Sequence, residues 1–171
     1  MIHVALLEPE IPPNTGNVAR LCAATGAVLH LIGRLGFQLD DRSLRRAGLD
    51  YWDALDVRRH GSLEDFEPLW AGEQAGRLFC FSAHAATPYT RVAYRPGDCL
   101  LFGGESRGLP PGLLRRHTDR AVVIPMPAGK VRSLNLATAV GIALYEALRQ
   151  LSAHQSQTET PGIRVPFTFI G

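Results

Sequence analysis

The sequence has little that would assign it to a fibrous, disordered or membrane-spanning class. Of its 171 residues, 46% are apolar and 20% are charged, which is ordinary globular usage. No apolar run reaches the roughly 20 residues that a membrane helix needs. Residues 1–14 carry acidic residues and no basic cluster, so we expect no secretory signal there. A chain of 171 residues favours one domain whose core needs no disulfide or metal.

Lysine and cysteine are both scarce. Lys130 is the sole lysine, so the other basic residues are all arginine, and the net formal charge is only +2. Arginine suits bidentate phosphate contacts and stacking on bases, although a preference for arginine codons in a GC-rich genome explains the same composition. The cysteines, Cys22, Cys80 and Cys99, have no metal-ligand spacing. We therefore expect buried, reduced thiols in a cytoplasmic protein that needs no membrane.

Motifs of several common enzyme classes are also missing. There is no G-x-G-x-x-G dinucleotide fingerprint, and no Lys-Ser or Lys-Thr pair follows the Gly103-Gly104 turn as in a phosphate-binding loop. Residues 104–108, Gly-Glu-Ser-Arg-Gly, match the G-x-S-x-G spelling of a hydrolase elbow, but we do not expect a hydrolase nucleophile there. His84 and His117 stand apart from other metal-binding residue types, so we expect no metal site and interpret both as surface histidines.

Short apolar, β-branched runs alternate with helical patterns along the chain. This alternation predicts an α/β fold, in which a mostly parallel sheet is flanked by helices. We expect a single domain over residues 1–151, followed by a mobile or loosely docked tail over 152–171. The expected strands are 2–7, 28–32, 56–60, 77–82, 99–102 and 121–124, and the expected helices are 14–27, 40–48, 62–70 and 133–151.

The first polar segment that follows a strand contains Pro12-Pro13-Asn14 and, further along, Arg20. Tandem prolines predict a loop up to Asn14, after which Asn14 or Thr15 would cap a helix. A helix N-terminus attracts anions, and Arg20 could face the same anion. The alternative interpretation is a rigid loop with an ordinary cap and a solvated arginine.

Two further segments follow strands, and ligands bind at strand carboxyl ends in open α/β sheets. Gly103-Gly104 would let a ligand approach the backbone closely, and Glu105 and Arg107 follow in the same turn. A glycine-rich turn with an Arg–Glu ion pair is the alternative. The other segment, residues 124–135, ends with Ser133 as the expected cap of the last helix. Asn135, in the first turn of that apolar helix, is expected to be buried and to need hydrogen-bond partners.

Taken together, these segments resemble the SPOUT-class RNA ribose 2′-O-methyltransferases, and within them the small members that modify the wobble nucleotide of tRNA. The resemblance covers residues 1 to about 151. It rests on EPEIPPNTGNVARLCAATG, LRRAGLDYWD, LFGGESRGLP and VIPMPAGKVRSLNLATAVGIALYE. In two places the chain differs from the usual pattern: Gly104 replaces a frequent proline and Leu134 a frequent methionine.

The resemblance implies a C-terminal trefoil knot that holds S-adenosyl-L-methionine, an obligate homodimer, and methyl transfer to the 2′-hydroxyl of C or U at position 34 of tRNA. It implies that the cofactor contacts fall on Phe81, Gly103, Ile124 and Ser133. The catalytic positions would be Arg20, Ser133 and Asn135, with Arg20 orienting a phosphate and stabilising the developing alkoxide. Asn14, Glu105 and Arg107 match the remaining polar motif residues.

Two other functions are compatible with the same resemblance. The chain could act on another ribose of tRNA or ribosomal RNA, although such enzymes often carry an added RNA-binding domain. It could also be a knotted RNA-binding protein without activity, although Arg20 and Asn135 are both present.

Overall fold

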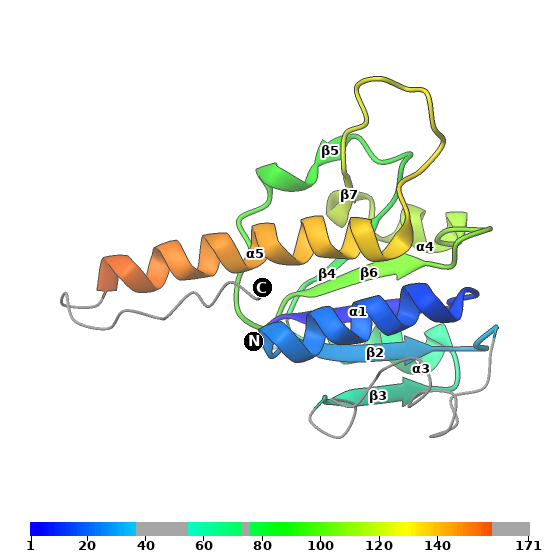
Figure 1. Cartoon of the computed structure of the whole chain (residues 1–171), viewed down its shortest axis with the longest axis horizontal. Helices are drawn as coiled ribbons and strands as arrows, with labels where there is room; N and C mark the ends of the chain where they lie inside the picture. The colour runs from blue at the N-terminus through cyan, green and yellow to red at the C-terminus, as the bar shows by residue number, and fades with distance from the viewer. Residues whose placement is uncertain (37–54, 73–75, 159–171) are drawn as a thin grey trace.

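A seven-stranded parallel sheet forms the centre of the molecule (Figure 1). The computed structural model describes residues 1–36, 55–72 and 76–158. The sheet order is β3-β2-β1-β6-β4-β7-β5, and every pairing between these strands is parallel. The predicted fold class is thereby confirmed. The strands are β1 (His3–Leu7), β2 (Val28–Ile32), β3 (Val57–His60), β4 (Leu78–Phe81), β5 (Thr87–Pro88), β6 (Cys99–Gly103) and β7 (Ala121–Val123).

Helices cover both faces of the sheet. Figure 1 shows the longest helix, α5, running alongside α1, and these two helices contact each other. The opposite face is covered by α3, the 3-10 turn that follows it, and α4. The helices are α1 (Pro12–Thr25), α3 (Leu63–Phe66), α4 (Pro111–Arg116) and α5 (Leu136–Thr158), with 3-10 turns at Glu67–Trp70, Tyr89–Arg91 and Thr118–Arg120.

Alternation of side chains along the strands divides the core into two layers. In β1, Val4 and Leu6 face α1 and α5, whereas Ala5 and Leu7 face α3 and α4. The first layer includes Val18, Cys22, Leu100, Val140 and Leu144, and the second includes Phe66, Cys80, Cys99, Leu101 and Leu113. All three cysteines are buried and free, as predicted. Burial raises the pKa of the Cys22 and Cys80 thiols to about 12, so neither is a reactive thiolate near neutral pH.

Helix α1 begins two residues earlier than predicted, because Pro12 and Pro13 form its first turn instead of a loop. The first N–H groups of a helix have no partner within it, so proline is tolerated there. The N-cap residue is Ile11, which makes no side-chain capping bond. The predicted cap residue, Asn14, therefore has its side chain available for another contact.

The last helix is displaced along the sequence relative to the prediction. It begins at Leu136 instead of Ser133 and continues to Thr158, beyond the expected end at residue 151. The oxygen of the Asn135 side chain accepts from the backbone N–H groups of Ala137 and Thr138 at 2.9 and 3.3 Å, so Asn135 and not Ser133 caps the helix. Asn135 is also exposed, which corrects the expectation of a buried amide.

Other sequence predictions have mixed outcomes. The helix predicted over 62–70 begins with α3, which Ser62 caps by accepting from the backbone N–H of Asp65 at 3.2 Å. The short strand β5 and helix α4 were not predicted, because each is only a few residues long. The expected helix at 40–48 and the LRRAGLDYWD segment lie outside the described residues. Within the described ranges, no helix is long and apolar enough to cross a membrane, and no cluster of His, Cys, Asp or Glu is suited to a metal.

Candidate functional site

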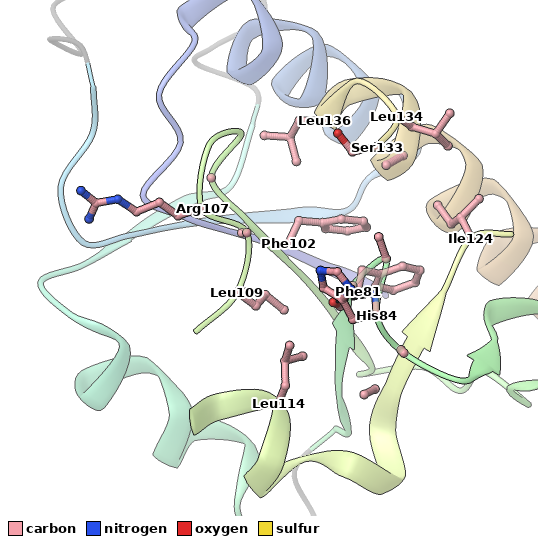
Figure 2. Close-up of a pocket in the computed structure, with 18 of the residues that line it drawn as sticks. Phe81, His84, Phe102, Arg107, Leu109, Leu114, Ile124, Ser133, Leu134 and Leu136 are labelled. Carbon is pink, nitrogen blue, oxygen red and sulfur yellow. Dashed lines mark hydrogen bonds between the residues drawn. The ribbon is translucent and has the colours of Figure 1, made fainter. Parts of the chain in front are cut away.

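A pocket of about 1080 Å³ opens where β4, β6 and β7 end and α5 begins. Its walls come from the three segments that follow these strands and from the start of α1. Figure 2 shows Ile124, Ser133 and Leu134 on one side of the pocket and Leu109 and Leu114 on another. The pocket therefore sits at the carboxyl edge of a parallel sheet, where ligands of α/β proteins bind.

The centre of the pocket is lined by two stacked aromatic rings. Phe81 ends β4 and Phe102 lies in the neighbouring strand β6, and their ring centroids are 4.5 Å apart at an interplanar angle of 19°. Both residues are buried, and Ile124 and Leu136 add aliphatic surface to the same lining. The side chains at the end of adjacent strands thus supply a flat apolar surface that suits a planar ring system.

Two glycines allow the chain to fold back on itself beside these rings. A Cβ atom on Gly103 would lie 2.0 Å from the carbonyl carbon of Gly108, which no side chain can do. Gly108 itself has φ +65°, a conformation that favours glycine, and its N–H donates to the Gly104 carbonyl at 2.8 Å. The turn over residues 104–108 is therefore tight, and it forms the rim of the pocket.

The acidic residue of this turn is bound to the start of α1. The Glu105 carboxylate accepts from the backbone N–H groups of Glu10 at 2.8 Å and Ile11 at 3.3 Å, and from the Asn14 side chain at 2.8 Å. The anion expected at the N-terminus of this helix is thus the protein's own Glu105. Burial alone would raise the pKa of Glu105, but these hydrogen bonds outweigh it and lower the pKa below its usual value. The alternative of an ion pair with Arg107 is wrong, since the Glu105 carboxylate faces the start of α1 and makes its hydrogen bonds there.

An amide pair extends this contact to the third segment. The Asn14 side-chain oxygen accepts from the Asn135 side-chain nitrogen at 2.9 Å, although the two residues are 121 positions apart. Asn14 is buried, and Asn135 caps α5 with its own oxygen. The start of α1, the turn after β6 and the start of α5 are therefore joined by one continuous set of hydrogen bonds.

The structure brings together all but one of the residues singled out from the sequence. Those that line the pocket are Asn14, Phe81, Gly103, Glu105, Arg107, Ile124, Ser133 and Asn135. Arg20 does not line it: it lies on the exposed face of α1, six residues after Asn14 and so about 9 Å further along the helix.

Several lining residues were missed by sequence reasoning. Ser82 and His84 follow β4 directly, and position after a strand end was the available signal. Leu109 and Leu114 come from the turn after β6 and from α4, an element that the sequence patterns did not predict. Two contacts at the rim, Glu10 and Ser106, were also missed because only the folded loops bring them together.

The fold and this arrangement define a class of protein. The profile of the SpoU rRNA Methylase family matches residues 1–145, and the chain belongs to this family. The chain is therefore an RNA methyltransferase of this family, and membership in the family implies the C-terminal trefoil knot.

Three individual proteins of this kind are similar to nearly the whole chain. The tRNA (cytidine(34)-2′-O)-methyltransferase of Burkholderia pseudomallei is 48% identical over 88% of this chain and 96% of its own length. A solved structure described as giving insights into the 2-OH methylation of C/U34 on tRNA superposes with a TM-score of 0.81, at 52% identity over 90% of this chain and 97% of that one. The SpoU methyltransferase AviRb of Streptomyces viridochromogenes, solved with AdoMet, has a TM-score of 0.75 at 29% identity over 88% of this chain and 60% of its own.

Proposed function

We propose that this chain transfers a methyl group from S-adenosyl-L-methionine to the ribose 2′-hydroxyl of nucleotide 34, a cytidine or uridine, of tRNA. The observation that carries the proposal is the convergence of three distant segments on one pocket, joined through Glu105, Asn14 and Asn135. The similarity of nearly the whole chain to enzymes of this specificity supports the choice of nucleotide.

The pocket suits the proposed cofactor. The adenine ring needs a flat apolar contact, which the Phe81–Phe102 pair and Ile124 offer. Gly103 and Gly104 line the same pocket, and the exposed Ser133 can donate or accept a hydrogen bond there. When bound, S-adenosyl-L-methionine supplies an activated methyl group on a sulfonium. We assign its binding to Phe81, Gly103, Ile124 and Ser133.

The remaining residues act on the RNA. Arg20 orients a phosphate next to the reacting ribose and stabilises negative charge on the 2′-oxygen as that oxygen loses its proton. We do not assign proton removal to Arg20, because a guanidinium keeps its proton in proteins. Ser133 and Asn135 hold the ribose against the methyl donor, and Arg107 meets the RNA at the mouth of the pocket. Positioning of this kind supplies about 7–11 kcal/mol in well-oriented reactions.

We further propose that the enzyme is a cytoplasmic homodimer. Arg20 lies outside the pocket of its own chain, so a second copy that packs against α1 and α5 would bring its arginine over this site. Helix α5 supports this arrangement, because Tyr145 is 54% exposed and Ile142, Leu148 and Leu151 of the same helix are only partly buried. Light scattering should give twice the chain mass of 18.7 kDa at micromolar concentration. A monodisperse species of one chain mass would contradict the dimer.

The test of the function compares two tRNAs with labelled cofactor. One is an all-ribose tRNA with C or U at position 34, and the other is identical except for a 2′-deoxyribose at that nucleotide. We expect both to bind and only the first to accept the label. Equal labelling of both would show that the enzyme acts on another ribose. Binding without labelling of either tRNA would identify a non-catalytic RNA-binding protein.

A further inference from the structure

Two glutamates join the loop after β1 to the turn after β6 by exchanging hydrogen bonds. Glu105 accepts from the backbone N–H of Glu10, 95 positions away, at 2.8 Å. Glu10 in return accepts from the backbone N–H of Ser106 at 3.2 Å and from the Ser106 hydroxyl. Each carboxylate therefore binds the segment that carries the other carboxylate. We call Glu10, Glu105 and Ser106 the glutamate clamp.

The two loops approach so closely that a side chain at Gly104 would not fit. A Cβ atom there would lie 2.5 Å from the Glu8 carbonyl oxygen and 3.1 Å from the Glu10 carboxylate. Glu8 has φ +47°, a left-handed conformation that a residue with a side chain adopts only when other contacts hold it. The shape of this loop is therefore imposed from outside, and the glutamate clamp supplies contacts that can impose it.

The clamp also determines which way the two amides at the pocket point. An ionised carboxylate only accepts hydrogen bonds, so Asn14 must turn its nitrogen to Glu105 and its oxygen to Asn135. Asn135 must then donate with its nitrogen, which leaves its oxygen for the backbone N–H groups that begin α5. The direction of the whole set of bonds is fixed by the position of Glu105.

We propose that Glu10 is a positioning residue for the methyl transfer, acting through Ser106 and Glu105 on the Asn14–Asn135 pair. This inference rests on the proposed function. Glu10 does not line the pocket, and a negative charge near the mouth would repel RNA phosphates instead of attracting them. Its carboxylate therefore serves to hold the 104–108 turn in place. When that turn moves, Glu105 no longer holds Asn14, and Asn135 loses its fixed orientation.

A glutamine can replace the hydrogen bonds of Glu10 but not those of Glu105. At position 10, a glutamine oxygen can accept from the Ser106 N–H while its nitrogen donates to the Ser106 hydroxyl, which is also an acceptor. At position 105, both carboxylate oxygens accept from separate donors, and an amide nitrogen facing either Glu10 N–H or Asn14 would oppose a donor. Glu10→Gln should therefore keep most of the kcat that Glu10→Ala loses. Glu105→Gln should lower kcat, because glutamine cannot replace the contacts of Glu105.

The experiment measures kcat and KM for tRNA, the affinity for S-adenosylhomocysteine by calorimetry, and amide hydrogen exchange of the ligand-free protein. Glu64→Ala is the matched control, because Glu64 is an exposed glutamate on α3 outside the pocket. For Glu10→Ala we expect kcat to fall about 10- to 100-fold, as misplacement near 1 Å does, with KM and cofactor affinity within about 3-fold of the parent protein. Ser106→Ala should lower kcat in the same direction, and the double variant should be no worse than Glu10→Ala alone.

Hydrogen exchange gives a readout that does not depend on activity. Exchange at the N–H of residue 106 should accelerate in Glu10→Ala and recover in Glu10→Gln, and exchange at residues 10 and 11 should accelerate in Glu105→Gln. The inference is overturned if Glu10→Ala keeps the parent kcat, if its cofactor affinity falls in parallel with kcat, or if the two single effects multiply in the double variant. If the parent protein and Glu64→Ala both fail to methylate tRNA while the exchange results hold, the proposed function is wrong and the clamp itself stands.

Discussion

Acid should destabilise this protein through a buried histidine that lies outside the pocket. His30 in β2 is 2% exposed and lies between His3 in β1 and His60 in β3. Its two ring nitrogens lie 3.0 Å from His3 Nδ1 and 2.9 Å from His60 Nε2. Phe66 and Trp70 pack edge-on against its ring, with centroids 5.4 and 6.0 Å away. A neutral imidazole, with one donor and one acceptor, satisfies both neighbours.

The pKa of His30 is lowered to about 3, first by burial and then by the neighbouring His3, His60 and Arg58, which together outweigh the opposing effect of Asp56. The pKa values of His3 and His60 are also lowered, in each case first by burial and then by Arg58. The unfolded chain therefore binds more protons than the folded protein once the pH falls below about 6.5. The free energy of unfolding is unaffected by these histidines above that pH and decreases as the pH falls from 6.5 toward 3.

For His30 alone, this decrease amounts to about 1.4 kcal/mol for each pH unit, or about 2 kcal/mol by pH 5.0. The assay is urea unfolding followed by circular dichroism at pH 7.5, 6.5 and 5.0, at one protein concentration. His30→Gln keeps a donor and an acceptor but cannot titrate. Its free energy of unfolding should therefore fall between pH 7.5 and 5.0 by more than about 1 kcal/mol less than that of the parent protein. His84→Gln, which removes an exposed histidine, is the control and should keep the full pH dependence. Parallel pH profiles for the parent protein and His30→Gln would refute this reasoning.

Three further predictions concern the pocket and its glycines. Arg20→Ala should lower the rate of methyl transfer by about 100-fold or more and leave the affinity for S-adenosylhomocysteine nearly intact, because it removes a donor that stabilises charge in the transition state. Arg20→Lys should restore little of this rate, and the control Arg91→Ala should keep the parent rate. Loss of cofactor binding in Arg20→Ala would contradict the division of roles between Arg20 and the pocket. S-adenosyl-L-methionine at one hundred times its Kd should stabilise the protein by about 2.7 kcal/mol in thermal unfolding, and a larger shift with NAD or ATP would contradict the assigned pocket. Gly103→Ala should lower the free energy of unfolding in urea by about 1–3 kcal/mol, because its Cβ atom would meet the Gly108 backbone. In the control Gly112→Ala the nearest atom to the new Cβ would be 3.8 Å away, so this variant should be as stable as the parent protein or more stable. Equal stability of the two variants would show that the turn can relax.

The sequence by itself determined the local structure and the identity of the polar groups. Apolar runs such as 28–32 and 99–102 became strands because they bury side chains on both faces of the sheet, as strands of a parallel sheet do. The Gly103-Gly104 pair after one of these runs predicted that a ligand approaches the backbone closely, whereas in the structure the backbone of Gly108 and of Glu8 makes the close approach. Local rules failed at the ends of helices. Pro12 and Pro13 are permitted in a first turn as well as in a loop, and either Ser133 or Asn135 can cap a helix.

Only the tertiary structure decided which polar groups meet. Nothing in the residues near Glu105 indicates that its partners are Glu10, Ile11 and Asn14, because hydrogen bonds across more than 90 positions depend on the order of the strands. The same holds for the three histidines, which look isolated in the sequence and become neighbours because β1, β2 and β3 are adjacent strands whose pairing places each histidine two positions from the next. Strand order is set by the packing of both core layers at once, and this is a property of the whole chain that no local pattern carries.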